Sequence, residues 1–122
     1  MEYTITLQGK QYPARFVLRT AILAAERRGG SVAKMLSNPN QVELLTDIPW
    51  LTVEMIKAGA WLREHETGIP TREIPTEDSI LDGYDYADLL ELQRQLLAVI
   101  NKDKPTVTAE GDPKNTDATP EA

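Results

Sequence analysis

The hydrophobic period of this sequence changes near residue 18, from the alternation typical of a β-strand to the spacing typical of a helix. Polar and apolar side chains alternate over residues 2–7, residues 8–11 supply a turn, and residues 12–17 resume an extended run. These segments predict a β-hairpin, and because an isolated hairpin is only marginally stable in water, its apolar face has to pack against helices. The residues of that face are Tyr3, Ile5, Leu7 and Phe16. The sequence therefore predicts an α+β fold, with an N-terminal β-hairpin packed on a mainly helical domain.

Helix stops and caps divide the following residues into several helices. Gly29-Gly30 ends the first helix, and Ser31 can cap a short second one. Asp47-Ile48-Pro49 resembles a helix start, because proline is tolerated in the first turn, where its missing N–H has no partner to lose. Thr76 and Asp85 are the expected N-caps of the last two helices. The predicted helices cover residues 18–28, 31–36, 41–46, 47–66, 77–81 and 86–101.

Apolar residues gather on one face of the first and last predicted helices. On the first helix, that face holds Leu18, Ala21, Ile22 and Ala25. On the last helix they approximate a heptad-like stripe over four turns, which is the cleanest amphipathic signal in the chain. That stripe comprises Tyr86, Leu89, Leu90, Gln93, Leu96, Leu97 and Ile100. Both helices are therefore expected to pack through one side.

The central predicted helix contains both tryptophans, Trp50 and Trp61. Because they are eleven residues apart, they fall on nearly the same side of the helix. Core packing is their default role, whereas an exposed tryptophan would be an interface anchor.

The composition changes after Asn101. Residues 102–122 consist mainly of Thr, Pro, Asp, Glu, Lys and Ala, and Val107 is their one larger aliphatic residue. Such a segment cannot bury enough apolar area to offset the entropy of ordering it. We therefore expect a hairpin plus helical domain over residues 1–101 and a disordered acidic tail over residues 102–122.

Charge is distributed unevenly along the chain. Residues 1–37 contain six Lys or Arg against two acidic residues, whereas residues 38–101 contain four against twelve. Oppositely charged ends favour head-to-tail association of copies, since complementary patches guide encounter and register. The formal net charge of −6 disfavours nucleic acid as a partner.

Residues with catalytic or metal-binding chemistry do not form a recognisable motif. The chain has no cysteine, which excludes disulfides, thiolate metal sites and Cys nucleophiles. The sole histidine, His65, has no second histidine three to five residues away, so its expected role is to complement a helix dipole. Asp82, Asp85 and Asp88 lack the calcium-loop pattern and are expected to stabilise helix starts. We expect a protein without cofactor or metal that is not an enzyme.

The sequence also bears on location. Its first residues lack the basic start and apolar run of a signal peptide, and no apolar stretch approaches the roughly 20 residues that cross a bilayer. We therefore expect a cytoplasmic protein that neither spans a membrane nor is exported.

The order of these features resembles one protein family. The features are a hairpin with a Gly-Lys turn, a helix ending in Gly-Gly, an Asn-Pro turn before a Leu-Leu helix, a Pro-Thr-Glu-Asp helix start and a Leu-rich terminal helix. They lie in residues 3–28, 38–45 and 75–97. In this order they resemble the tail assembly chaperones of long-tailed bacteriophages and related prophages, especially those of Gram-positive hosts. The two tryptophans and the proline-bearing connection over residues 67–75 depart from that pattern.

The resemblance implies a factor of phage tail morphogenesis that acts in the cytoplasm of the bacterial host and is absent from the mature virion. Such a chaperone binds the aggregation-prone tape measure protein, keeps it soluble and recruits tail tube subunits, while its copies associate into oligomers or a spiral. Two alternatives stay open. One is a small phage or prophage regulator that binds nucleic acid, and the other is a structural head–tail connector or completion subunit.

Two sets of residues are candidate binding sites. Recognition of an amphipathic helix needs apolar anchors at three- and four-residue spacing. The candidate partner-binding residues, if exposed, are Trp61, Leu89, Leu92 and Leu96, with ordinary core packing as the alternative. The candidate self-association residues are Arg15, Arg19, Arg27 and Arg28, which would meet Asp82, Asp85, Asp88 and Glu91 of a neighbouring copy.

Overall fold

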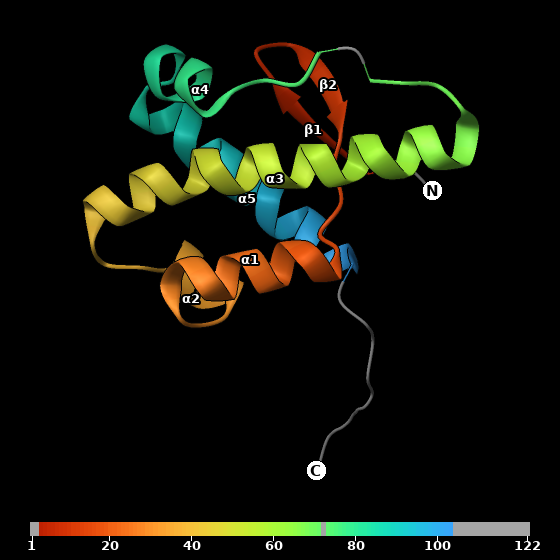
Figure 1. Cartoon of the computed structure of the whole chain (residues 1–122). Helices are drawn as coiled ribbons and strands as arrows, with labels where there is room; N and C mark the ends of the chain where they lie inside the picture. Colours follow the sequence, from red (N-terminus) through yellow and green to blue (C-terminus); the bar gives the residue numbers. More distant parts are fainter. Residues whose placement is uncertain (1–2, 72, 104–122) are drawn as a thin grey trace.

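The computed structural model describes residues 3–71 and 73–103, which form a β-hairpin and helices arranged around one long helix (Figure 1). In chain order the elements are β1 (Thr4–Leu7), β2 (Lys10–Pro13), α1 (Leu18–Arg28), α2 (Val32–Leu36), α3 (Gln41–Thr67), α4 (Glu77–Gly83) and α5 (Tyr86–Asp103). Helix α3 packs against β2 and against the other helices, so it is the centre of the domain. The predicted α+β fold, a hairpin on a mainly helical domain, is confirmed.

The hairpin is a two-stranded antiparallel sheet with a tight turn at Gln8-Gly9. The two turn residues have φ values of 50° and 82°, as a two-residue type I′ turn requires. Leu7 pairs with Lys10 on either side of this turn, so the turn predicted over residues 8–11 is two residues too long. The second strand covers Lys10–Pro13 and not the predicted residues 12–17. Ile5 and Leu7 are buried, so the predicted apolar face packs on the helices as expected.

The outer edge of β1 is covered by a side chain of α5. The Gln95 Oε1 atom accepts a hydrogen bond from the Thr6 N–H at 2.7 Å, and Gln95 Nε2 donates to the Thr6 carbonyl oxygen at 3.1 Å. These are the two bonds that a neighbouring strand would exchange with Thr6. The two residues are 89 positions apart, so this contact joins the beginning of the domain to its end.

Helix α3 is continuous, and the predicted helix start at Asp47 is therefore wrong. The helix begins after Asn40, whose side chain accepts a hydrogen bond from the Glu43 N–H at 3.1 Å. Pro49 lies inside the helix, where it removes one backbone hydrogen bond. Asp47, Ile48 and Pro49 are all buried, so tertiary packing offsets that loss.

The core lies between α3, α5 and the hairpin. Its fully buried large side chains include Ile5 of β1, Ile48, Leu51, Met55 and Ile56 of α3, and Leu92, Leu96 and Ile100 of α5. Burial of each such aliphatic side chain contributes about 1.5–3 kcal/mol. The side of α5 that carries these residues therefore packs against other elements of this chain.

The connection from β2 to α1 crosses α3 at Gly59. A Cβ atom at this position would lie 2.4 Å from the Ala14 backbone nitrogen and 2.5 Å from the Pro13 carbonyl carbon. At the same crossing, the Arg15 N–H donates to the Met55 carbonyl oxygen at 3.0 Å. Only glycine allows two backbones to approach this closely, so the hairpin is joined to the central helix by direct backbone contact.

Helix α5 continues to Asp103, two residues beyond the predicted domain boundary at Asn101. The rest of the predicted disordered tail, residues 104–122, lies outside the described residues.

In the described part of the chain, no helix combines the length and the apolar character needed to cross a membrane.

Candidate partner-binding surfaces

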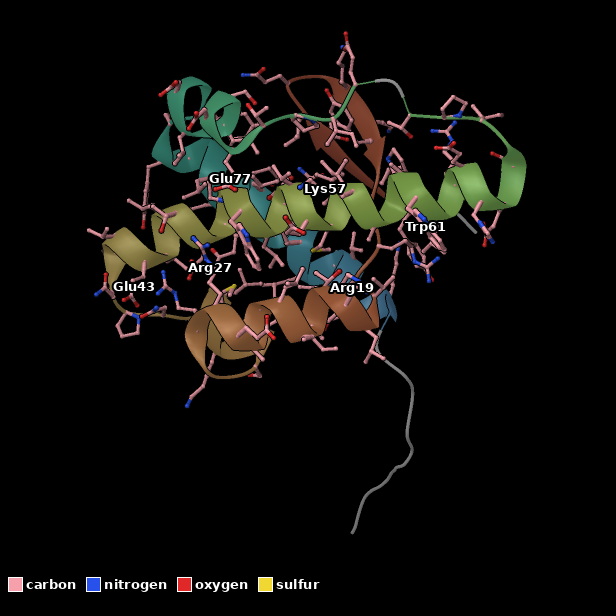
Figure 2. All side chains as sticks on the ribbon, in the orientation of Figure 1. Arg19, Arg27, Glu43, Lys57, Trp61 and Glu77 are labelled. Atoms are coloured by element: carbon pink, nitrogen blue, oxygen red, sulfur yellow. The ribbon has the colours of Figure 1, made fainter. Side chains whose placement is uncertain are left out.

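Asp47 of α3 binds two of the four arginines that were predicted to act in self-association. Its side chain is fully buried and accepts hydrogen bonds from Arg27 Nε at 2.7 Å, Arg28 Nε at 2.6 Å and Arg28 Nη2 at 3.0 Å. Arg28 also lies 3.5 Å from Glu43, and the Arg27 guanidinium lies over the Trp50 ring at 4.8 Å. Figure 2 shows Arg27 between α1 and α3. The two arginines therefore join these helices.

The carboxyl group of Asp47 is charged at neutral pH despite its burial. Burial by itself raises a carboxyl pKa, but the hydrogen bonds and charges of Arg28 and Arg27 outweigh it and hold the pKa of Asp47 below its usual value. The hydrogen bond to Asp47 in turn raises the pKa of Arg28. This group of three side chains is thus an ion-pair cluster, and it fixes which side of α1 faces α3.

The other two predicted self-association arginines are placed differently. The Arg15 guanidinium lies over the Tyr3 ring at 5.1 Å. Arg19 is exposed near the start of α1 (Figure 2), and no ion pair or hydrogen bond joins its side chain to another described residue. Arg19 is therefore available for contact with a second molecule.

The four predicted acidic partners lie at the surface of α4 and α5. Asp88 N–H donates to Asp85 Oδ1 at 2.8 Å, and Asp85 N–H donates to Asp88 Oδ2 at 3.2 Å, so the two residues cap α5 reciprocally. The predicted capping role of Asp85 is confirmed. Glu91 pairs with Arg94 one turn further on. Asp82 is exposed in the last turn of α4, so its predicted place at a helix start is wrong. Together these acids make this part of the surface negative.

Three of the four predicted partner-binding residues are buried. Leu89, Leu92 and Leu96 have exposed fractions of 7%, 1% and 0% and belong to the core. These leucines could bind a partner only if their side chains were exposed, so the alternative, core packing, is correct for them. The reason is that α3 and β1 cover this side of α5. Trp61, in contrast, is 62% exposed and stacks on His65 with ring centroids 4.8 Å apart.

A second apolar column on α5, which we call the α5 column, is exposed. It consists of Tyr86, Leu90 and Leu97, at positions i, i+4 and i+11 on one side of the helix. The predicted stripe therefore divides into a buried column and an exposed one, and Gln93, which lies between Leu90 and Leu97, is half-buried and donates a hydrogen bond to the Leu36 carbonyl oxygen of α2. The sequence signal for an exposed apolar column was the width of the stripe, because seven residues are more than one buried helix face requires.

Helix α1 also directs its apolar face to solvent. Leu18 and Ile22 are 79% and 51% exposed, and Ala25 on the same face is exposed too. We call these three residues the α1 column. The buried side of the helix consists of Thr20 and Ala24, which face α2 and α3. The ion-pair cluster explains this orientation, since it draws the opposite side of α1 toward α3.

Among residues 3–71 and 73–103, no three histidine or acidic side chains gather closely enough to hold a metal ion. No family model, curated protein or solved structure matches the chain. The surface features that bear on function are therefore the exposed apolar columns and the charges beside them.

Proposed function

We propose that this chain is a non-enzymatic tail assembly chaperone, which binds the tape measure protein, keeps it soluble and recruits tail tube subunits in the cytoplasm of the bacterial host. It is absent from the mature virion, and its copies associate on the partner. The observation that carries the proposal is the exposed α5 column on a domain whose core is already complete without it.

The α5 column has the dimensions of a helix-binding surface. From Tyr86 to Leu97 it extends over about 16 Å, which is three turns of a partner helix at about 1.5 Å per residue. Recognition of amphipathic helices uses anchors three to four residues apart, as Tyr86 and Leu90 are. A long helical protein with a repeated apolar face could therefore bind many copies of this chain.

The charges near the α5 column favour a partner with basic residues beside its apolar face. Asp82, Asp85 and Asp88 precede or flank the start of the column. Opposite charges across an interface speed encounter and select the register of binding. The nucleic-acid alternative is less well supported, because Arg27 and Arg28 are already bound to an acidic residue of the same chain.

Co-expression with a tape measure protein tests the proposal. We expect a soluble complex by affinity purification and size exclusion, and no copies of this chain in purified particles. If the tape measure protein stays insoluble and the chain elutes alone, the proposed function is refuted. Detection of the chain in mature particles would instead favour the connector alternative.

A pair of matched variants tests the site. Leu90 is 47% exposed on the α5 column, and Ile69, which is 55% exposed, follows the far end of α3. Leu90→Glu should weaken binding of the tape measure protein about tenfold, because burial of the exposed half of the leucine is worth roughly 1 kcal/mol and the variant also places a charge in the apolar contact. Ile69→Glu should leave binding unchanged. An equal loss in both variants would exclude the α5 column as the site.

A further inference from the structure

We infer that the α1 column is a contact between two copies of this chain, whose α1 helices pack antiparallel about a two-fold axis near Ile22. This inference deepens the self-association in the proposed function and rests on it, but it is independent of what the α5 column binds. It differs from the predicted head-to-tail pairing, in which two of the four arginines would have to leave Asp47.

The α1 column has the composition of a contact surface. Leu18 and Ile22 lie one turn apart on the outer side of the helix, and Ala25 and Gly29 continue the same side. The α1 column together with Gly29 therefore presents two large side chains at one end and two small residues at the other. When two such columns meet antiparallel about Ile22, the two Ile22 side chains face each other, and Leu18 of each copy meets the small-residue end of the other.

A column of charge lies directly beside the α1 column. Arg19 and Glu26 are seven residues apart, so they project from the same side of α1, and both are exposed. Within the described residues neither side chain has an ion-pair partner. One column thus holds a positive and a negative charge about 10 Å apart along the helix axis.

The signs of these charges select the antiparallel arrangement. When two α1 helices pack antiparallel through their α1 columns, the column of charge on one helix faces the column of charge on the other. The two columns run in opposite directions. Arg19 of one copy then lies opposite Glu26 of the other, and the two-fold axis repeats the pair. In a parallel pair, the opposing column would hold Ala21 and Arg28, which offer Arg19 no negative charge. The surface is therefore complementary to itself in one orientation.

The size of the surface sets the expected strength. Helix α1 has eleven residues and is about 16 Å long, so two such helices bury less than the roughly 1,200 Å² typical of a stable interface. The dimer of the chain alone should therefore have a dissociation constant in the high micromolar range. Copies held side by side on a long partner would have a higher effective concentration, which strengthens a weak contact.

Charge reversal tests the pairing by sedimentation velocity over a concentration series of the full chain. Arg19→Glu and Glu26→Arg should each weaken the dimer about tenfold, because every reversal affects two symmetric pairs. The double variant, R19E with E26R, should restore dimerisation to within about twofold, since it exchanges the charges within the column. Circular dichroism would verify that all three variants keep their helix content.

Cysteine cross-linking tests the position of the axis, because the chain contains no other thiol. Helix axes about 8–10 Å apart, with Cα atoms at a radius of about 2.3 Å, place two facing Cα atoms about 3.4–5.4 Å apart. This range overlaps the roughly 4.4–6.8 Å that a disulfide spans. Ile22→Cys should therefore form a disulfide-linked dimer at least tenfold faster than Ile69→Cys, whose side chain is similarly exposed.

Each outcome decides the inference. Fast cross-linking through residue 22 together with rescue by the double reversal would establish it. Equal cross-linking at residues 22 and 69, or charge reversal without effect, would overturn it. If the wild-type chain is monomeric and Arg19→Glu instead weakens binding of the tape measure protein, the α1 column belongs to that partner. If charge reversal and cross-linking both give the overturning result while a soluble complex with the tape measure protein still forms, the dimer is overturned and the chaperone proposal stays intact.

Discussion

Replacement of Asp47 by asparagine should be among the most damaging conservative changes in this protein. The asparagine amide has nearly the same shape, but it removes the negative charge and places an NH₂ donor against the Arg27 and Arg28 donors. Loss of one partner of a buried ion pair costs about 3–5 kcal/mol. The two arginine side chains keep exposures of 31% and 26%, so water compensates part of that cost. We expect Asp47→Asn to lower the free energy of unfolding by about 2–3 kcal/mol at pH 7.

The effect should depend on pH with a defined sign. The pKa of Asp47 is lowered in the folded protein, so its contribution to the free energy of unfolding is complete above the unfolded-state pKa of about 3.9. The contribution is lost as the pH falls through the lower folded-state value. The difference between wild type and Asp47→Asn should therefore be constant from pH 7 to pH 5 and shrink below pH 4.

Urea denaturation followed by circular dichroism measures this difference at each pH. Asp82→Asn is the matched control, because it changes the net charge equally at an exposed position on α4. We expect that control to stay within about 0.5 kcal/mol of wild type. A similarly small effect of Asp47→Asn, or a difference from wild type that grows on acidification, would refute the assignment of net stabilisation to the ion-pair cluster.

Two further changes test the contacts that attach the hairpin. Gly59→Ala should reduce the free energy of unfolding by about 1–3 kcal/mol in urea denaturation, because the added Cβ overlaps the crossing backbone, whereas Gly30→Ala, which meets a flexible lysine side chain, should be nearly neutral. Gln95→Ala should cost about 1–3 kcal/mol and speed amide exchange at Thr6, since it removes two hydrogen bonds, and unchanged exchange at Thr6 would contradict the described role of Gln95.

Local sequence signals predicted the elements that depend on local structure. The turn at Gln8-Gly9, the helix stop at Gly29-Gly30 and the caps at Ser31 and Asp85 act through backbone conformations and hydrogen bonds within a few residues. They do not depend on what packs against them. For that reason the hairpin and most helix boundaries were predictable from the sequence.

The failures concern choices that only long-range contacts decide. Proline at a first turn is favourable, but it does not prevent a helix from starting earlier, and the burial around Pro49 decided that α3 begins at residue 41. The helical periodicity of α1 is confirmed, but the expectation that α1 packs through its apolar side is wrong, because periodicity does not state which face is covered. An overlooked signal was Asp47 itself, because a carboxylate next to a buried apolar run requires a cation from elsewhere in the chain.

The contact between Gln95 and Thr6 also constrains how the protein is made. Thr6 is synthesised 89 residues before its partner Gln95. At about 5–20 residues per second, the ribosome needs about 4–18 s to add them. During that time the apolar side of β1 has no completed core to cover it, although the hairpin itself can form within microseconds. The outer edge of β1 is therefore covered only after α5 has been synthesised, and newly made copies are most prone to wrong association before that point.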